Sequence, residues 1–138
     1  MTKNDIFKKE LIIELKNVAK MMTEEKDIEK KIYLFSASYG ITSRTFRYDF
    51  KEDYLLADFV LNATYNGLIE RLNRLKSGDS TVMLENIHFE RIQNGLLELA
   101  VSFEKNLPPI DPLKKILSTM YSTTGPGYYL RLKGMMDF

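Results

Sequence analysis

The chain contains no cysteine and only one histidine, His88. Without cysteine it can form neither a disulfide nor a thiolate metal site, and this composition is typical of proteins from a reducing compartment. A zinc site that takes two or more histidines from one chain is excluded as well. We therefore expect neither a metal site nor another cofactor.

The sequence also lacks an excess of charge of one sign and a long hydrophobic run. It has 20 Lys and Arg residues against 19 Asp and Glu residues, which gives a formal net charge of +1. Nucleic-acid-binding proteins usually carry a clustered basic excess, and none is visible here. No apolar run approaches the ~20 residues of a membrane helix, and the first residues do not resemble a signal peptide. These patterns predict a cytoplasmic protein with no nucleic-acid and no membrane partner.

Proline is missing from most of the chain, since all four prolines lie at or beyond Pro108. Two long stretches, about 49–77 and about 81–106, can therefore form uninterrupted helices on either side of a tight turn at 78–80. In the second stretch, apolar residues recur at spacings of three and four, the signature of one buried helix face. These residues are Phe89, Ile92, Leu96, Leu99 and Phe103. The pattern predicts a helical hairpin.

The N-terminal part shows two apolar stripes, over residues 7–22 and 28–39. Thr23 followed by two glutamates is typical of a new helix start, because a hydroxyl cap and acidic residues favour a helix N-terminus. No glycine or proline forces a break, however, so 4–39 could form either two helices or one. Gly40 is a suitable end for the second stripe.

The remaining segments complete the predicted fold. Residues 41–48 are rich in β-branched and aromatic side chains, which indicates an extended connector or a short strand. Asp49 with Glu52 is a capping-box-like start for the third helix, and Asp111 with Pro112 opens a short fifth helix. Residues 128–138 could form a short strand or an ordered tail. We therefore expect one domain, 1–138, with an all-α fold: an up-and-down bundle of four main helices, a short fifth helix and at most a minor pair of short strands.

Asp58 is the most unusual residue of the third helix, because it lies inside an apolar octet. A buried carboxylate must find partners or take up a proton, and such perturbed acids are frequent in active sites. They are also frequent as structural anchors. The sequence favours a buried aspartate that is hydrogen-bonded to neighbouring side chains.

Glu85 and His88 have the Glu-x-x-His spacing of di-iron bundles, but a carboxylate-bridged site needs this motif twice. One histidine per chain excludes it within a monomer. A more ordinary interpretation is that Glu85 stabilises the start of a helix and His88 borders its apolar face.

Two hydroxyl-rich segments, 36–48 and 121–129, contain or precede arginines. Hydroxyls, glycine amides and arginines are the ingredients of an anion site, although they also dominate ordinary turns. Neither segment matches a phosphate-binding loop. If a small-molecule site exists, these segments are where we expect it. The candidate ligand-binding residues are Asp58, Arg44, Arg47, Tyr128 and Arg131.

Two functions stay open at this point, and whether the protein is an enzyme is undecided. The first is an oligomerising structural or protein-interaction module, which the wide apolar arcs and the lack of convergent catalytic groups favour. The alternative is a small-molecule or anion-binding protein that uses the hydroxyl- and arginine-rich loops at one end of the bundle. Residues 55–61 are apolar nearly all round the third helix, and the end of the chain is apolar too. We expect a two-fold homodimer that buries this helix or the tail against its copy.

Overall fold

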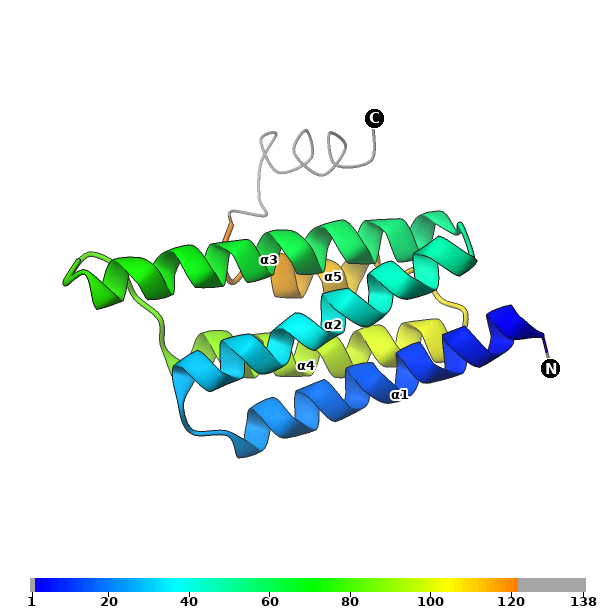
Figure 1. The fold of residues 1–138 in the computed structure, drawn as a ribbon, viewed down its shortest axis with the longest axis horizontal. Coiled ribbons are helices and arrows are strands. Elements are labelled where there is room, and N and C mark those ends of the chain that lie inside the picture. Colours follow the sequence, from blue (N-terminus) through cyan, green and yellow to red (C-terminus); the bar gives the residue numbers. More distant parts are fainter. Residues whose placement is uncertain (1, 122–138) are drawn as a thin grey trace.

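The protein is all-α in the computed structural model, which describes residues 2–121. In this part of the chain the elements are five helices. Their bounds are α1 (Lys3–Glu24), α2 (Ile28–Tyr48), α3 (Glu52–Lys76), α4 (Asn86–Glu104) and α5 (Ile110–Leu117). The helix α1 packs against α2 and α4, and α2 packs against α3 (Figure 1). The short α5 packs against both α3 and α4, which have few direct contacts with each other. The third and fourth helices therefore do not pack against each other as the hairpin that we expected, because α5 lies between them.

The N-terminal region forms two helices, which decides the question that the sequence left open. The break falls at 25–27 because Asp27 caps α2: its Oδ1 accepts hydrogen bonds from the backbone N–H groups of Glu29 (2.9 Å) and Lys30 (3.4 Å). Thr23 is not the cap that we expected. Its hydroxyl donates to the carbonyl of Ala19 (2.8 Å) and so belongs to the last turn of α1. An aspartate four residues later takes the capping role.

The prediction of an extended segment at 41–48 is wrong, because α2 continues to Tyr48. The hydroxyls of Thr42 and Thr45 donate back to the carbonyls of Ser38 (2.6 Å) and Ile41 (2.8 Å), so these polar groups are satisfied inside the helix. Both threonines are also buried. Tertiary packing thus outweighs the strand preference of β-branched residues. Residues 128–138, for which we allowed a strand, lie outside the described residues.

The connection between α3 and α4 is longer than the turn at 78–80 that we expected. Gly78 does end α3, with a positive φ of 86° that favours glycine. Next, Asp79 Oδ1 accepts hydrogen bonds from the backbone N–H (2.9 Å) and the hydroxyl (2.6 Å) of Thr81. These bonds and Arg74 lower the pKa of Asp79 to about 2. They hold Thr81 in a turn, so α4 begins only at Asn86.

The start of α3 also differs from the prediction. The residue that precedes the helix is Lys51, which makes no side-chain capping bond, and Asp49 instead ends α2. The predicted short fifth helix is confirmed, but it begins earlier than expected: Pro109 is the N-terminal cap residue, no side chain makes a capping hydrogen bond, and Asp111 and Pro112 lie inside the first turn.

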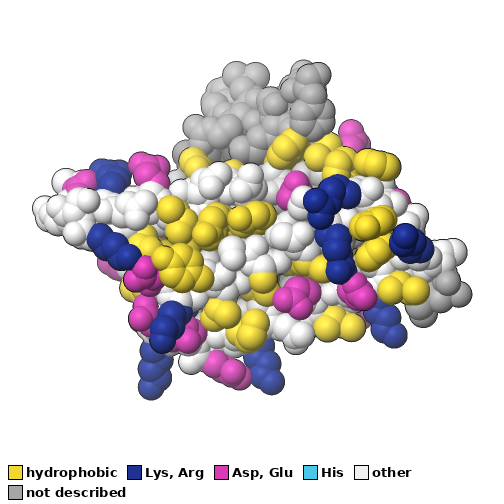
Figure 2. Space-filling view, viewed as in Figure 1, with side chains coloured by type: hydrophobic (Ala, Val, Ile, Leu, Met, Phe, Trp, Pro, Cys, Tyr) yellow, Lys and Arg dark blue, Asp and Glu magenta, His cyan; other side chains and the backbone are white. Residues whose placement is uncertain are grey.

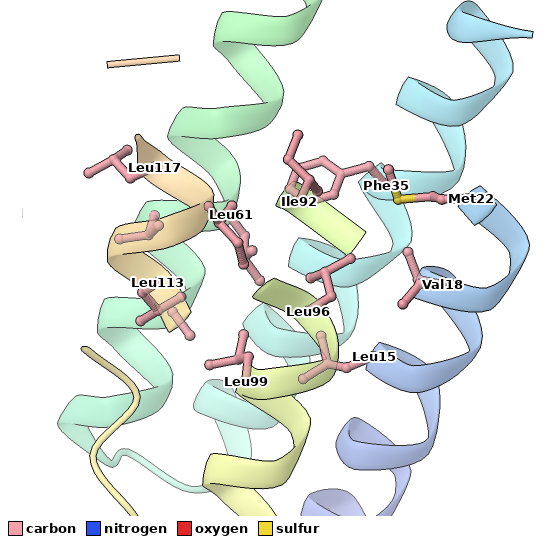
Figure 3. Close-up of a cluster of buried hydrophobic side chains, with 14 of the residues drawn as sticks. Leu15, Val18, Met22, Phe35, Leu61, Ile92, Leu96, Leu99, Leu113 and Leu117 are labelled. Carbon is pink, nitrogen blue, oxygen red and sulfur yellow. The ribbon is translucent and has the colours of Figure 1, made fainter. Parts of the chain in front are cut away.

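The core is built from inward faces of all five helices (Figure 3). The five apolar residues that the sequence assigns to one face of α4 are all buried, with at most 4% of their surface exposed. They meet residues from α1 and α2 on one side and from α5 on the other. Labelled examples in Figure 3 are Val18, Phe35, Leu61, Leu96 and Leu113.

The apolar part of α3 is covered largely within the chain, so a second subunit is not needed for that purpose. Tyr54, Ala57, Val60 and Leu61 are buried. The segment after α5 lies against the middle of α3, where Met120 Cβ would be 3.1 Å from a side chain at Gly67. The hydroxyl of Tyr121 also donates to the Ala63 carbonyl (3.3 Å).

Helices α4 and α5 approach each other closely at Gly95. A Cβ atom at this position would lie 2.4 Å from Cγ1 of Ile116 and 3.4 Å from the carbonyl oxygen of Pro112. Gly40 in α2 provides a contrast, since nothing lies within 4 Å of the corresponding Cβ position. The first glycine is required by packing, whereas the second only costs helix stability.

The two glycines give a matched test of this packing. We expect Gly95→Ala to lower the free energy of unfolding by about 1–3 kcal/mol, because the methyl group forces α5 away from α4. Gly40→Ala should raise it by about 0.5–1 kcal/mol, because alanine favours the helix. Urea unfolding followed by circular dichroism measures both. Equal effects of the two substitutions would contradict the close contact at Gly95.

Candidate functional site

The two arginines predicted from the sequence lie on α2 but contact different neighbouring helices. Arg44 forms an ion pair with Glu10 of α1, and its guanidinium lies 5.1 Å from the ring centroid of Phe7. Its Nε is buried without a hydrogen-bond partner within residues 2–121. Arg47 faces α3 instead, where its charge acts on Asp58. The segment that carries them is helix and not a loop.

Asp58 is partly buried on α3. Burial raises the pKa of its carboxyl above the ordinary value of 3.8, and the positive charge of Arg47 acts in the opposite direction. Within residues 2–121 its carboxylate accepts no hydrogen bond, so the anchor role predicted for it is not seen there. Tyr128 and Arg131, the other candidate residues, lie outside the described part. Among the three candidates that lie within residues 2–121, Arg47 acts electrostatically on Asp58, whereas Arg44 is paired with Glu10.

A polar hollow of ≈ 450 Å³ opens at the end of the bundle where α1 ends and α2 and α4 begin. Its lining includes two polar residues that are more than nine-tenths buried: Lys31 is 7% exposed and Gln93 is 6% exposed. Lys31 Nζ donates to the carbonyl of Met22 (2.5 Å) and lies 5.9 Å from the ring centroid of Phe89. Glu25, Lys26 and Glu90 also contribute to the lining. We name this the Lys31 pocket.

Sequence reasoning missed the Lys31 pocket, although one signal was present. Gln93 stands four residues after Phe89 and three before Leu96, so it occupies an inward position of α4 between two apolar residues. A polar side chain there must be buried with a partner or face a cavity. The sequence gives no comparable signal for Lys31, because a lysine among lysines and glutamates is usually exposed.

A second, smaller hollow of ≈ 230 Å³ lies at the opposite end of the bundle. Lys8, Lys51 and Tyr54 line it, and the ring of Tyr54 lies tilted against that of Phe103, with 5.2 Å between the ring centroids. Burial, followed by the nearby charges of Asp49 and Asp53, raises the pKa of Tyr54 to about 12. The phenol is therefore protonated at neutral pH and is a poor candidate for a general base.

His88 has a structural role at the start of α4. Its Nδ1 accepts a hydrogen bond from the backbone N–H of Glu85 (3.0 Å). This nitrogen is therefore occupied, and the Glu85–His88 spacing serves the helix terminus. Within the described residues, no group of three or more acidic or histidine side chains is placed to hold a metal ion.

The surface carries both signs of charge. Figure 2 shows acidic and basic side chains interspersed with hydrophobic ones over the visible face. No helix in the part of the chain that the structure describes has the length and apolar character needed to cross a membrane.

Comparison of the chain with protein-family models, with curated proteins and with solved structures found no match. The candidate sites therefore depend on the geometry alone.

The ionisation of Asp58 gives a testable pH dependence. A pKa that is raised in the folded state means that ionisation destabilises the fold above that pKa, and that this cost disappears below 3.8. We expect Asp58→Asn to raise the free energy of unfolding at neutral pH by less than about 1 kcal/mol, because Arg47 offsets part of the cost. This increase in the free energy of unfolding should disappear below about pH 3.8, where the carboxyl of Asp58 is protonated in both states. Urea unfolding at several pH values measures it.

Asp53→Asn is the control, since Asp53 is exposed in the first turn of α3. There a carboxylate interacts favourably with the helix dipole, so its removal should slightly destabilise the protein. A loss of stability in both variants would contradict the burial cost that we assign to Asp58.

Proposed function

We propose that this protein is an interaction module that assembles as a homodimer through the outer faces of α1 and α4. The observation that carries the proposal is a pair of exposed stripes with helical spacing on these two neighbouring helices. Both stripes combine large apolar residues with charges of one sign. The proposal moves the expected interface from the third helix and the tail to this surface.

The stripe on α1 is basic and apolar. Its members recur at spacings of three and four and are all exposed: Ile6, Lys9, Ile13, Lys16 and Lys20. The two isoleucines have 44% and 49% of their surface exposed. Apolar residues on the outward face of a helix are typical of a surface that another helix covers.

The stripe on α4 has the same spacing and the opposite charge. Its members, also all exposed, are Glu90, Asn94, Leu97, Val101 and Glu104. Leu97 and Val101 are 43% and 39% exposed. The helix α4 thus has apolar residues on its outer face as well as its inner face.

The two stripes border one seam, because α1 and α4 pack directly together. Lys16 Nζ lies 2.9 Å from a carboxylate oxygen of Glu104, and Lys8 bonds to Asn106 beyond the end of α4. As the residue number increases along α1, the number of the contacting residue in α4 decreases. The two helices therefore run antiparallel. A two-fold axis along this seam would lay α1 of one copy on α4 of the other.

This arrangement is self-complementary in charge and apolar character. At the level of the bond between Lys16 and Glu104, Lys16 of one copy would face the partner's Glu104, and the exposed apolar residues of both stripes would be covered in the same interface. An interface of this kind is isologous, so each favourable contact occurs twice. The affinity of the dimer should fall as the salt concentration rises, because salt screens the charges at the rim of an interface.

We expect Ile13→Glu to convert the dimer to a monomer, because the substitution removes a central apolar contact and places a carboxylate against the partner's acidic stripe. The dissociation constant of the dimer should increase by at least about tenfold, which corresponds to a loss of about 1.4 kcal/mol of binding free energy. Sedimentation equilibrium at several protein concentrations measures it. Circular dichroism checks that the helices stay intact.

Met83→Glu is the matched control, since Met83 is 59% exposed but lies in the connection between α3 and α4. It should leave the dimer unchanged. A wild-type protein that is monomeric at high micromolar concentration would refute the proposal.

Other parts of the earlier expectation stay predictions. We propose that the four long helices form an up-and-down bundle in which α5 fills the gap between α3 and α4. The cytoplasmic location and the absence of nucleic-acid and membrane partners also stay predictions. The alternative function, an anion site built on Arg44, Arg47, Tyr128 and Arg131, has weaker support because Arg44 is already paired with Glu10.

A further inference from the structure

We propose that the Lys31 pocket binds a small organic carboxylate that carries a second polar group. The ammonium of Lys31 would hold the carboxylate, and the side-chain amide of Gln93 would bind the polar group. The inference goes beyond the proposed interaction function and does not depend on dimer formation.

Lys31 carries a buried charge that the described chain does not neutralise. Its ammonium forms no ion pair with an Asp or Glu side chain within residues 2–121. Burying an unpaired charge is costly, and the bond to the Met22 carbonyl and the Phe89 ring offset only part of that cost. An ammonium has three donors, and only one is used by Met22. An anion in the pocket would satisfy the others.

The bond to Met22 also has a structural explanation. Met22 belongs to the last turn of α1, where carbonyl groups lack helical partners and a cation is favourable. Lys31 therefore ties the end of α1 to α2. This role explains one donor, but it explains neither the burial of the charge without a carboxylate nor the state of Gln93.

Gln93 supplies the second, independent observation. Its Nε2 is buried and has no hydrogen-bond partner within the described residues. Leaving a buried amide donor without a hydrogen-bond partner destabilises the folded state. A half-turn of the amide group exchanges its nitrogen and oxygen, so the donor can be turned toward the pocket without moving the helix. A ligand with an acceptor group would make that state favourable.

The size and charge of the pocket define the class of ligand. Its volume of ≈ 450 Å³ falls in the range of small-molecule sites. The lining holds two lysines, Lys26 and Lys31, and two glutamates, Glu25 and Glu90, so its net charge is zero, although neither glutamate forms an ion pair with Lys31. No arginine is present in the lining. A phosphate dianion is therefore disfavoured, and a singly charged carboxylate fits better.

The test is a titration of the full-length protein with glycolate, which has one carboxylate and one hydroxyl. The side-chain NH2 signals of Gln93 are followed by NMR at constant ionic strength. We expect a saturable shift of these signals. Inorganic phosphate at the same ionic strength should shift them at least about tenfold more weakly, as its extra charge is not matched. A non-saturating shift, or an equal response to phosphate, would overturn the proposal.

Two variants identify the residues involved. Lys31→Met should weaken glycolate binding by about tenfold or more, the usual effect of losing a charged hydrogen bond. Lys30→Met is the matched control: Lys30 is the exposed neighbour on the same helix, and binding should change less than about twofold. If Lys31→Met binds like the wild type, or both variants lose binding equally, the assignment is wrong.

Gln93→Glu keeps the test valid even if Lys31→Met fails to fold. The new carboxylate would supply the missing partner of Lys31, so we expect a higher melting temperature together with loss of glycolate binding. Because this variant lacks the Gln93 signals, binding is followed here by the backbone amide signal of Lys31. A lower melting temperature with unchanged binding would contradict the proposal. Repeating the titration with Ile13→Glu separates this result from the dimer, because that substitution should leave the Lys31 pocket intact.

Discussion

The contact between α4 and α5 at Gly95 is the constraint on which the arrangement of the helices depends. Because a glycine allows the side chain of Ile116 to approach the α4 backbone, the short helix can fill the space between α3 and α4. The two long helices then cannot pack as a simple hairpin. Their connection must span that gap, and the turn at Asp79 and Thr81 delays the start of α4 accordingly. One close contact thus links the position of α5 with the length of the preceding connection.

The Lys31 pocket lies where α1 ends and where α2 and α4 begin. Lys31 reaches across this region to the last carbonyls of α1, and its aliphatic chain and ammonium lie near Phe89. A lysine can lie there because its apolar stem contributes to the packing. Its charge is then the feature that still needs a partner.

Much of the fold could be predicted from the sequence, because periodic apolar residues report directly on buried helix faces. The stripe from Phe89 to Phe103 and the proline-led fifth helix are examples. Segment 41–48 could not be assigned in this way: its threonines satisfy their hydroxyls within the helix, and that outcome depends on burial against α3 and α1. Arg44 and Arg47 were predicted to lie in an extended segment, whereas both lie on α2: Arg44 pairs with Glu10 of α1, and the charge of Arg47 acts on Asp58 of α3. The Lys31 pocket was missed for the same reason, since it joins three helix ends.

A helix that is apolar on both faces must be covered on both faces, and α3 and α4 meet this requirement differently. In α3 the second face is met by α5 and the residues after it, so the chain covers itself. In α4 the inner face is buried, whereas Leu97 and Val101 stay on the outside beside the isoleucines of α1. Single exposed apolar residues are common, whereas the exposed apolar residues of α1 and α4 share a helical period and lie beside charges of opposite sign. Periodicity therefore carries two kinds of information in this protein. One stripe of α4 defines how the chain folds, and the other is the basis of the dimer that we propose.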